Sequence, residues 1–208
     1  MIEGRMRIKT LLTIIFCVCL ILGCGKKEAL KEDPVQKGQG SENPQKEDPI
    51  LREISRQKEL SPYLTELQLS EKKIGDISAL KDVISLKFLT LDKNNINDVS
   101  PLSKLGNLKQ LFLSENKISD VTALKELIWL EALTLNNNKI SDVSALKGLN
   151  RLDTLWLHNN EISDVSPLKE LKELQDLRLQ NNVNLTKAQI AELQKALPNC
   201  EIQHNASK

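Results

Sequence analysis

The sequence is poor in the residues from which catalytic and metal sites are most often built. Its 208 residues include two histidines and four cysteines, and aromatic side chains make up 3% of the chain. No glycine-rich phosphate loop, metal-ligand spacing of histidine and cysteine, or pairing of a nucleophile with a base stands out. We therefore expect neither an enzyme nor a bound metal, cofactor or small-molecule substrate.

Neither sign of charge is in excess. Lysine and arginine total 29 against 28 for aspartate and glutamate, a formal net charge of +1. Residues 1–23 hold three of the basic residues and one of the acids, so the charge stays near zero without them. This balance argues against a nucleic-acid partner and against a polybasic membrane patch.

The cysteines do not predict an internal disulfide. Cys17 and Cys19 lie within an apolar run near the N-terminus, and Cys24 follows that run. This leaves Cys200 alone in the rest of the chain, and we expect it to be a small buried side chain.

Leucine at fixed spacing is what the sequence has in abundance. The stretch 86–107, LKFLTLDKNNINDVSPLSKLGN, recurs with a 22-residue period at 108, 130 and 152, with looser copies that begin at Leu64 and Leu174. Leu89 and Leu91 alternate with other residues in the pattern of a short strand with one buried face. One unit cannot bury its own apolar face, so successive units must stack with their strands in a parallel sheet.

Two polar residue types recur in register with the leucines. An asparagine follows each strand, where its amide can satisfy backbone groups of the turn. An aspartate precedes Val or Ile and then Ser or Thr; the column can be interpreted as a calcium ladder, but this position favours capping of backbone N–H groups. The asparagines are Asn94, Asn116, Asn138, Asn160 and Asn182, and the aspartates are Asp76, Asp98, Asp120, Asp142 and Asp164.

These units resemble bacterial leucine-rich repeats of the internalin-like type, whose 22-residue unit reads LxxLxxLxLxxNxIxDxxxL. The match covers Leu64 to about Leu185. Lys72 replaces the asparagine of the first unit and Asn184 the isoleucine of the last, as expected of end units. The resemblance implies an α/β repeat fold, a right-handed solenoid with parallel strands on the concave face and short helical turns on the convex face. It also implies binding of a protein partner.

Helical caps are predicted at both ends of the array. Asp48 and Pro49 begin a helix that we expect to run to about Glu59 and to cover the first unit. At the other end, 186–189 has the pattern of a capping box, apolar residues follow at helical spacing up to Pro198, and 200–202 could add a strand.

The N-terminal segment resembles a bacterial lipoprotein signal. Arg7 and Lys9 precede an apolar run, 11–22, that is too short to span a bilayer as a helix. The sequence LILGC at 20–24 is similar to a lipobox, which implies cleavage after Gly23 and lipidation of Cys24. The alternatives are an ordinary secretory signal and an uncleaved anchor. Acyl chains on Cys24 would hold the protein at a membrane, so we expect a lipid-anchored, extracytoplasmic protein of the bacterial cell envelope.

The chain therefore divides into six predicted parts. Residues 1–5 contain IEGR, the site of a tag-removing protease, and are either an expression-tag remnant or a chance match. The others are the signal peptide (6–23), a disordered tether (24–47), the N-terminal helical cap (48–63), six repeats (64–185), and the C-terminal cap and tail (186–208).

The side chains that face away from the core on the strands are not dictated by the repeat. Phe88, Phe112 and Trp156 occupy such positions on the predicted concave face. Strands lie about 4.8 Å apart, so we expect Phe88 and Phe112 to touch and the small Ala132 and Thr134 to lie between Phe112 and Trp156. Exposed aromatics rimmed by polar groups are typical of protein-binding hot spots. The predicted partner-binding residues are Phe88, Thr90, Phe112, Thr134, Trp156, His158 and Arg178.

Two functions follow from these observations. The first is a membrane-anchored recognition module, expected to be a monomer, that binds a protein partner through the concave face. The second is a structural or scaffolding lipoprotein of the cell envelope without a single hot spot, since aromatics also favour strands and pack on their lateral neighbours.

Overall fold

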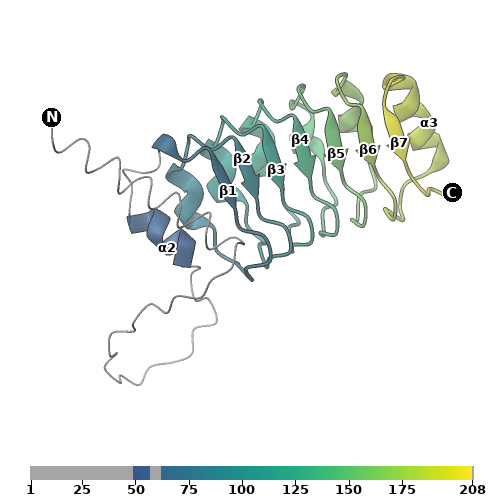
Figure 1. Ribbon diagram of the computed structural model, residues 1–208. Coiled ribbons are helices and arrows are strands. Elements are labelled where there is room, and N and C mark those ends of the chain that lie inside the picture. The colour runs from purple at the N-terminus through teal and green to yellow at the C-terminus, as the bar shows by residue number, and fades with distance from the viewer. Residues whose placement is uncertain (1–48, 57–61, 208) are drawn as a thin grey trace, which may run out of the picture. The chain divides into compact units, whose positions relative to one another are not determined.

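The computed structural model describes residues 49–56 and 62–207 (Figure 1). The predicted tag remnant, the signal peptide, Cys24 and the tether lie outside these residues. No helix in the described part is long and apolar enough to cross a membrane.

The described residues form a coil that repeats every 22 residues and places one short strand per turn in a single parallel sheet (Figure 1). Leu89 pairs with Leu67 on one side and Leu111 on the other, and the same offset continues to Leu177. The strands lie in sequence order: β1 (Glu66–Gln68), β2 (Phe88–Thr90), β3 (Gln110–Phe112), β4 (Ala132–Thr134), β5 (Thr154–Trp156), β6 (Asp176–Arg178) and β7 (Glu201–Gln203).

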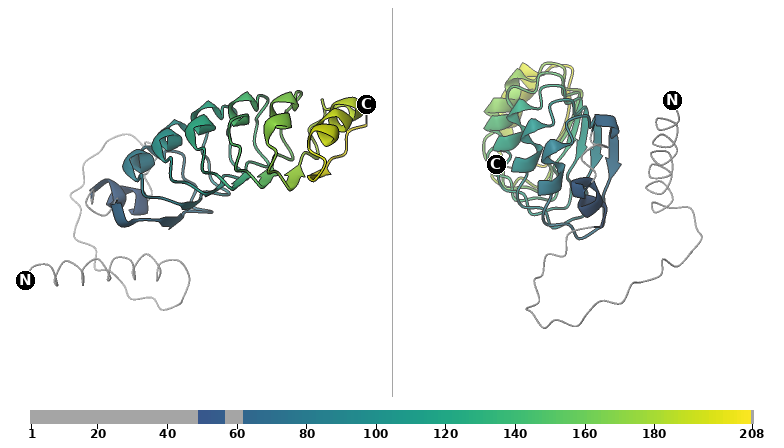
Figure 2. Two further views of the ribbon diagram at one scale, coloured as in Figure 1. Left: turned by 90° about the horizontal axis from the view of Figure 1, so that it is seen from above. Right: turned by 90° about the vertical axis from the view of Figure 1, so that its left-hand side faces the viewer.

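Short 3₁₀ helices lie on the side opposite the strands (Figure 2). Each begins directly after a buried Val or Ile and carries a buried leucine, such as Leu102, which anchors the turn in the core. They are η2 (Ser78–Asp82), η3 (Ser100–Lys104), η4 (Thr122–Glu126), η5 (Ser144–Leu146) and η6 (Ser166–Glu170). The predicted α/β repeat fold is therefore confirmed.

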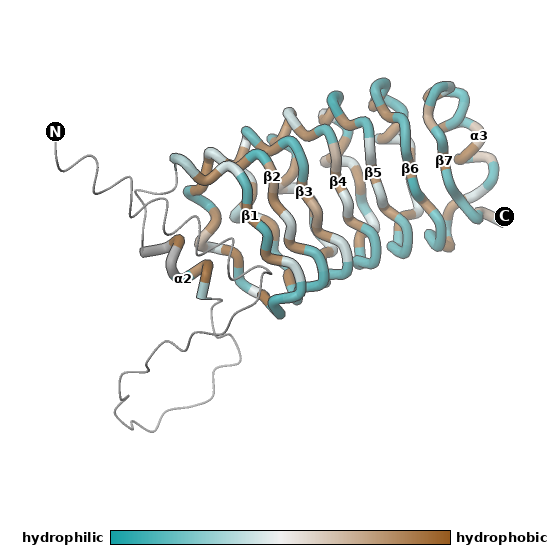
Figure 3. The backbone as a smooth tube through the Cα atoms, viewed as in Figure 1, coloured by the Kyte–Doolittle hydropathy of each residue, from teal (hydrophilic) through white to brown (hydrophobic). Residues whose placement is uncertain are grey.

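The core is a stack of aliphatic columns between the strands and the 3₁₀ helices. Leu89 of β2 and Leu91, just after it, point inward and are fully buried, and so are their equivalents in the next coils. The same sequence of apolar and polar segments recurs from coil to coil (Figure 3). Because each coil buries its apolar side chains against its neighbours, stability comes from stacking.

A helix covers each end of the stack. At the N-terminal end α2 (Pro49–Arg56) buries Leu51 fully and packs Ile50 and Ile54 on the core. The predicted N-cap Asp48 and the continuation to Glu59 lie outside the described residues.

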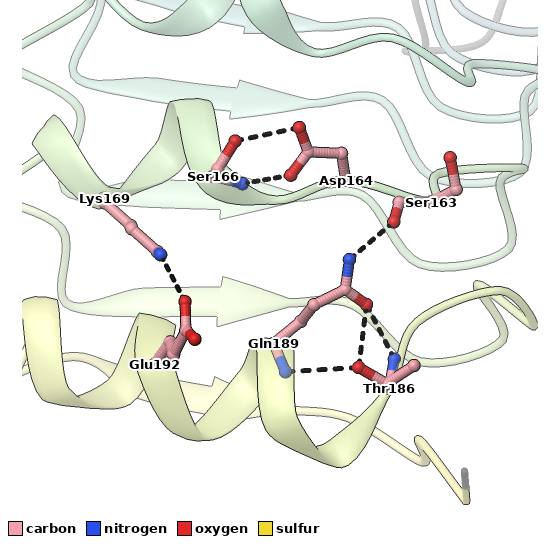
Figure 4. Close-up of polar contacts among 7 residues, drawn as sticks. All are labelled: Ser163, Asp164, Ser166, Lys169, Thr186, Gln189 and Glu192. Carbon is pink, nitrogen blue, oxygen red and sulfur yellow. Dashed lines mark hydrogen bonds and ion pairs between the residues drawn. The ribbon is translucent and has the colours of Figure 1, made fainter.

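The C-terminal helix α3 (Lys187–Ala196) begins with the predicted capping box. Gln189 N–H donates to Thr186 Oγ1 at 3.2 Å, and Thr186 N–H donates to Gln189 Oε1 at 2.9 Å (Figure 4). Gln189 Nε2 also donates to Ser163 O at 2.8 Å, and Lys169 pairs with Glu192 at 2.7 Å, so the cap is tied to the preceding coil (Figure 4).

Cys200 lies between α3 and β7. As the sequence predicts, it is buried and is a free thiol. Burial raises the pKa of this thiol to about 11, so it stays protonated near neutrality.

Candidate partner-binding face

Both recurring polar columns are structural. Asn160 Nδ2 donates to Leu135 O and Leu157 O at 3.0 Å, and its Oδ1 accepts from Ile140 N at 3.0 Å. Each aspartate of the second column accepts the N–H of the Ser or Thr two residues later at 2.8 Å, which confirms the capping interpretation (Figure 4). Hydrogen bonds from the side chain and then the backbone N–H of Thr122 lower the pKa of Asp120, and those from the backbone N–H and then the side chain of Ser166 lower the pKa of Asp164. Among the described residues no group of three or more His, Cys, Asp or Glu could hold a metal.

The outward side chains of the strands form rows across the sheet because the strands pair with a constant offset. We call three of these rows the sheet face; it corresponds to the predicted concave face. The first row is Phe88, Gln110, Ala132, Thr154 and Asp176, the second is Thr90, Phe112, Thr134, Trp156 and Arg178, and the third, just beyond the strands, is Asp92, Ser114, Asn136, His158 and Gln180.

The two phenylalanines lie on adjacent strands but in different rows. Phe88 is opposite Gln110, and Phe112 is opposite Thr90, so the expected contact between the two rings is at most a diagonal one. Phe88 is 36% exposed and Phe112 is partly exposed. In the N-terminal half of the sheet face, the rings of Phe88 and Phe112 are therefore at least partly exposed. Among the described residues, neither ring forms a pair with another aromatic ring.

Thr134 lies between Phe112 and Trp156 in the second row, as expected, but it is only 4% exposed. Its hydroxyl accepts a hydrogen bond from Ser114 Oγ at 2.8 Å, and Ser114 Oγ also approaches Asn136 Oδ1 at 2.7 Å. Thr134 thus forms the floor between two aromatic side chains and offers no accessible hydroxyl to a partner.

Trp156 is held by two residues of β6, Asp176 and Arg178. Its Nε1–H donates to Asp176 Oδ2 at 2.8 Å, and the guanidinium carbon of Arg178 lies 4.0 Å from the ring centroid. Arg178 is itself paired with Asp176, at 3.2 Å between Nη2 and Oδ2. Because Asp176 and Arg178 bind each other and the indole, they hold the ring of Trp156 in one position while it remains partly exposed.

His158 packs beside Trp156, with ring centroids 6.5 Å apart. In the described part of the chain, His158 Nδ1 and Gln180 Oε1 are the buried side-chain polar atoms without a hydrogen-bond partner. Burial, and then the charge of Arg178, lower the pKa of His158. The imidazole is therefore neutral near pH 7, and it contributes shape more than charge to the face.

The residue that sequence reasoning missed is Asp176. Its outward position on β6 follows from the 22-residue repeat, but its role in fixing Trp156 and Arg178 was not predicted. The available signal was the offset: 176 and 178 lie 20 and 22 residues after Trp156, which makes them its diagonal and lateral neighbours across one strand pair.

Comparisons with known proteins agree with this geometry. A family model described as leucine-rich repeats in two copies matches residues 84–126 and 128–170. The structure of internalin C2 from Listeria monocytogenes is 31% identical, with a TM-score of 0.65, over 71% of this chain and 67% of that chain. A search of curated proteins found no match. The chain belongs to the internalin-like leucine-rich-repeat proteins of bacteria.

Two further solved structures extend the comparison. A leucine-rich-repeat protein of Leptospira interrogans is 31% identical with a TM-score of 0.64, and the match covers 68% of this chain but 37% of that one. A second Listeria monocytogenes internalin, inlF, shares the fold at 23% identity and a TM-score of 0.58, over 76% of this chain and 56% of its own. Both of these proteins are considerably longer than the part that matches this chain.

Proposed function

We propose that this chain is a membrane-anchored recognition module that binds a protein partner through the sheet face. The observation that carries the proposal is the fixed and partly exposed Trp156, held by Asp176 and Arg178 in a row that also contains Phe112. Tryptophan and arginine are enriched among the residues that dominate binding energy. A side chain already held in its bound position loses little entropy on association.

Thr90, His158 and Arg178 border these aromatics and give the site a polar rim. Arg178 and Asp176 neutralise each other, so the cluster favours a partner with an apolar contact surface over a strongly charged one. The membrane anchor in this proposal is lipidated Cys24, which places the protein in the extracytoplasmic cell envelope; its support is the LILGC sequence.

The test is a pull-down with the full chain from extracts of bacterial envelopes and of candidate host cells. The native chain is compared with a Phe88→Ala, Phe112→Ala, Trp156→Ala variant whose fold is checked by circular dichroism. A matched control carries Tyr63→Ala and Val183→Ala, which remove exposed side chains (68% and 75% accessible) away from the sheet face.

We expect the native chain and the control to retain a protein that the triple variant loses. If all three recover the same proteins, the sheet face is not the binding site and the scaffolding function is favoured. Lipidation is checked separately by mass spectrometry of the membrane fraction, in which Cys24→Ser should abolish acylation.

A further inference from the structure

A second exposed apolar surface lies away from the sheet face, at the edge where the strands begin. Ile84 and Ile128 are 54% and 53% exposed, and Trp129 is 45% exposed with the guanidinium of Arg151 4.0 Å from its ring centroid. We call residues 84–87, 106–109, 128–131 and 150–153, which lead into β2, β3, β4 and β5, the leading edge. Exposed large apolar side chains gathered on one edge indicate an interaction surface.

The leading edge is ordered by backbone hydrogen bonds between adjacent coils. Lys109 N–H donates to Lys87 O at 2.8 Å, Glu131 N–H to Lys109 O at 2.8 Å, and Asp153 N–H to Glu131 O at 2.9 Å. The four side chains therefore stand in a line with a charge sequence of plus, plus, minus, minus. At its middle, Lys109 Nζ lies 2.8 Å from Glu131 Oε1.

Side-chain size follows a matching sequence. The residues four positions before each strand begins are Ile84, Gly106, Ile128 and Asn150, so large apolar side chains alternate with smaller residues. A Cβ placed on Gly106 would meet no atom within 4 Å, so the space above this glycine is open.

The order of charges and the order of side-chain sizes along the leading edge are both self-complementary under a two-fold axis that passes between β3 and β4. Such an axis sets Lys87 opposite Asp153 of a second copy and Lys109 opposite its Glu131. It also sets Ile128 over the open Gly106 and Ile84 over Asn150. Strand spacing is the same, about 4.8 Å, in both copies, so all four contacts are met in register, and each occurs twice.

We propose that the leading edge is a two-fold contact between two copies of this chain. This inference goes beyond the proposed function, because it uses a surface other than the sheet face, and it departs from the monomer expected from the sequence. A parallel arrangement in the same register would set like charges opposite each other. Charge complementarity therefore selects the antiparallel dimer.

The test uses charge reversals at the outer pair of the line. Within one chain Lys87 and Asp153 lie directly before β2 and β5 and are separated by two coils, so any coupling between them in association must act between copies. Sedimentation velocity is run over a range of concentrations on the full chain, on K87E, on D153K, on an equimolar mixture of the two, and on W129A. Circular dichroism checks the fold of each variant, and the sheet-face triple variant serves as a control.

We expect each reversal to weaken self-association about tenfold or more at low salt, since two attractive contacts become repulsive. Mixing K87E with D153K should restore it, because both contacts of the mixed dimer again join unlike charges. W129A should also weaken it, and the sheet-face variant should dimerise normally whether or not the proposed function holds.

A chain that stays monomeric at all concentrations would overturn the inference, and so would association that K87E does not change or that mixing does not restore. Association with an unrelated protein through the same residues, without self-association, would also overturn it.

Discussion

The first three coils and the last three build the same turn with different residues. At one position after each strand the backbone has positive φ, and in the first three coils this position holds Glu71, Lys93 or Glu115 (φ 54–62°). The first coil has a second such residue, Lys73, with φ of 59°. In the last three it is asparagine, with φ of 57–60°. Asparagine tolerates this conformation better than most non-glycine residues. The backbone geometry is therefore set by the stack, while the residue that fills it is free to vary.

The asparagines of the last three coils gain a contact that the charged residues lack. Asn159 Nδ2 donates to Asn137 Oδ1 at 2.7 Å, Asn181 Nδ2 to Asn159 Oδ1 at 2.6 Å, and Asn205 Nδ2 to Asn181 Oδ1 at 2.6 Å. At this position the first half has an exposed ion pair, Lys93 with Glu71 at 2.8 Å. Exposed ion pairs of this kind contribute little to the stability of the fold. The C-terminal half thus has an exposed amide ladder beside the buried one.

The largest expected effect tests whether the buried ladder is equal in both halves. Asn160→Ala leaves Ile140 N–H and two carbonyls of the adjoining coils without their partner, and Asn94→Ala does the same around Ile74 N–H. Each substitution should lower the free energy of unfolding by about 3 kcal/mol, because buried groups lose their hydrogen bonds. Urea denaturation measures both, and a loss in only one half would contradict the equivalence of the coils.

Asp176→Ala should make the C-terminal half of the sheet face resemble the N-terminal half. Trp156 loses its hydrogen bond and Arg178 its counter-ion, so the indole becomes mobile and the free energy of unfolding falls by about 1 kcal/mol. In a Trp129→Phe background, acrylamide quenching of Trp156 should rise, and binding of the sheet-face partner should weaken several-fold. Glu66→Gln at the equivalent position of β1 is the control, and equal quenching in both would disprove the role of Asp176.

Glu115→Asn should extend the exposed amide ladder into the first half. Asparagine relieves the cost of positive φ, and its amide lies next to Asn137, so we expect a gain of about 0.5–1 kcal/mol in the free energy of unfolding. Glu115→Gln removes the same charge without the preference for this conformation. If glutamine stabilises as much as asparagine, charge and not backbone geometry explains the difference between the halves.

The smallest effect is a pH dependence confined to the second half. The pKa of His158 in the folded protein is lowered from 6.5, chiefly by burial, so the unfolded chain binds a proton first as pH falls. The free energy of unfolding is therefore unaffected by this histidine above about pH 6.5, and it falls as pH drops below that value. Unfolding by urea at pH 7.5 and at pH 5.5 should show this decline in the native chain and a smaller one in His158→Gln. An identical decline in both would assign it to other groups.

The sequence predicts the framework well because the framework repeats. A leucine or asparagine that recurs every 22 residues occupies the same environment each time, so the strands, the buried ladder and the aspartate caps follow from one unit. Phe112, Trp156 and Thr134 were correctly predicted to follow one another across the sheet.

What does not repeat was harder to predict. The hold of Asp176 on Trp156 and the burial of Thr134 depend on side-chain rotamers, and each occurs once. The diagonal offset of Phe88 from Phe112 could have been predicted, because the two residues lie 24 positions apart and the repeat is 22. The exposed asparagine ladder went unpredicted for a related reason, since the repeat does not distinguish an outward amide from an outward charge.

The 22-residue offset between paired strands has a consequence for how such a protein changes over time. Since each coil contacts only its neighbours, duplication or deletion of one whole coil leaves the remaining joints as they were. One inserted coil between β3 and β5 would move Phe112 and Trp156 apart by about 4.8 Å while preserving both side-chain environments. The distance between the two aromatics is thus a heritable quantity that changes in discrete steps, and gene duplication alone can match it to the dimensions of a new partner.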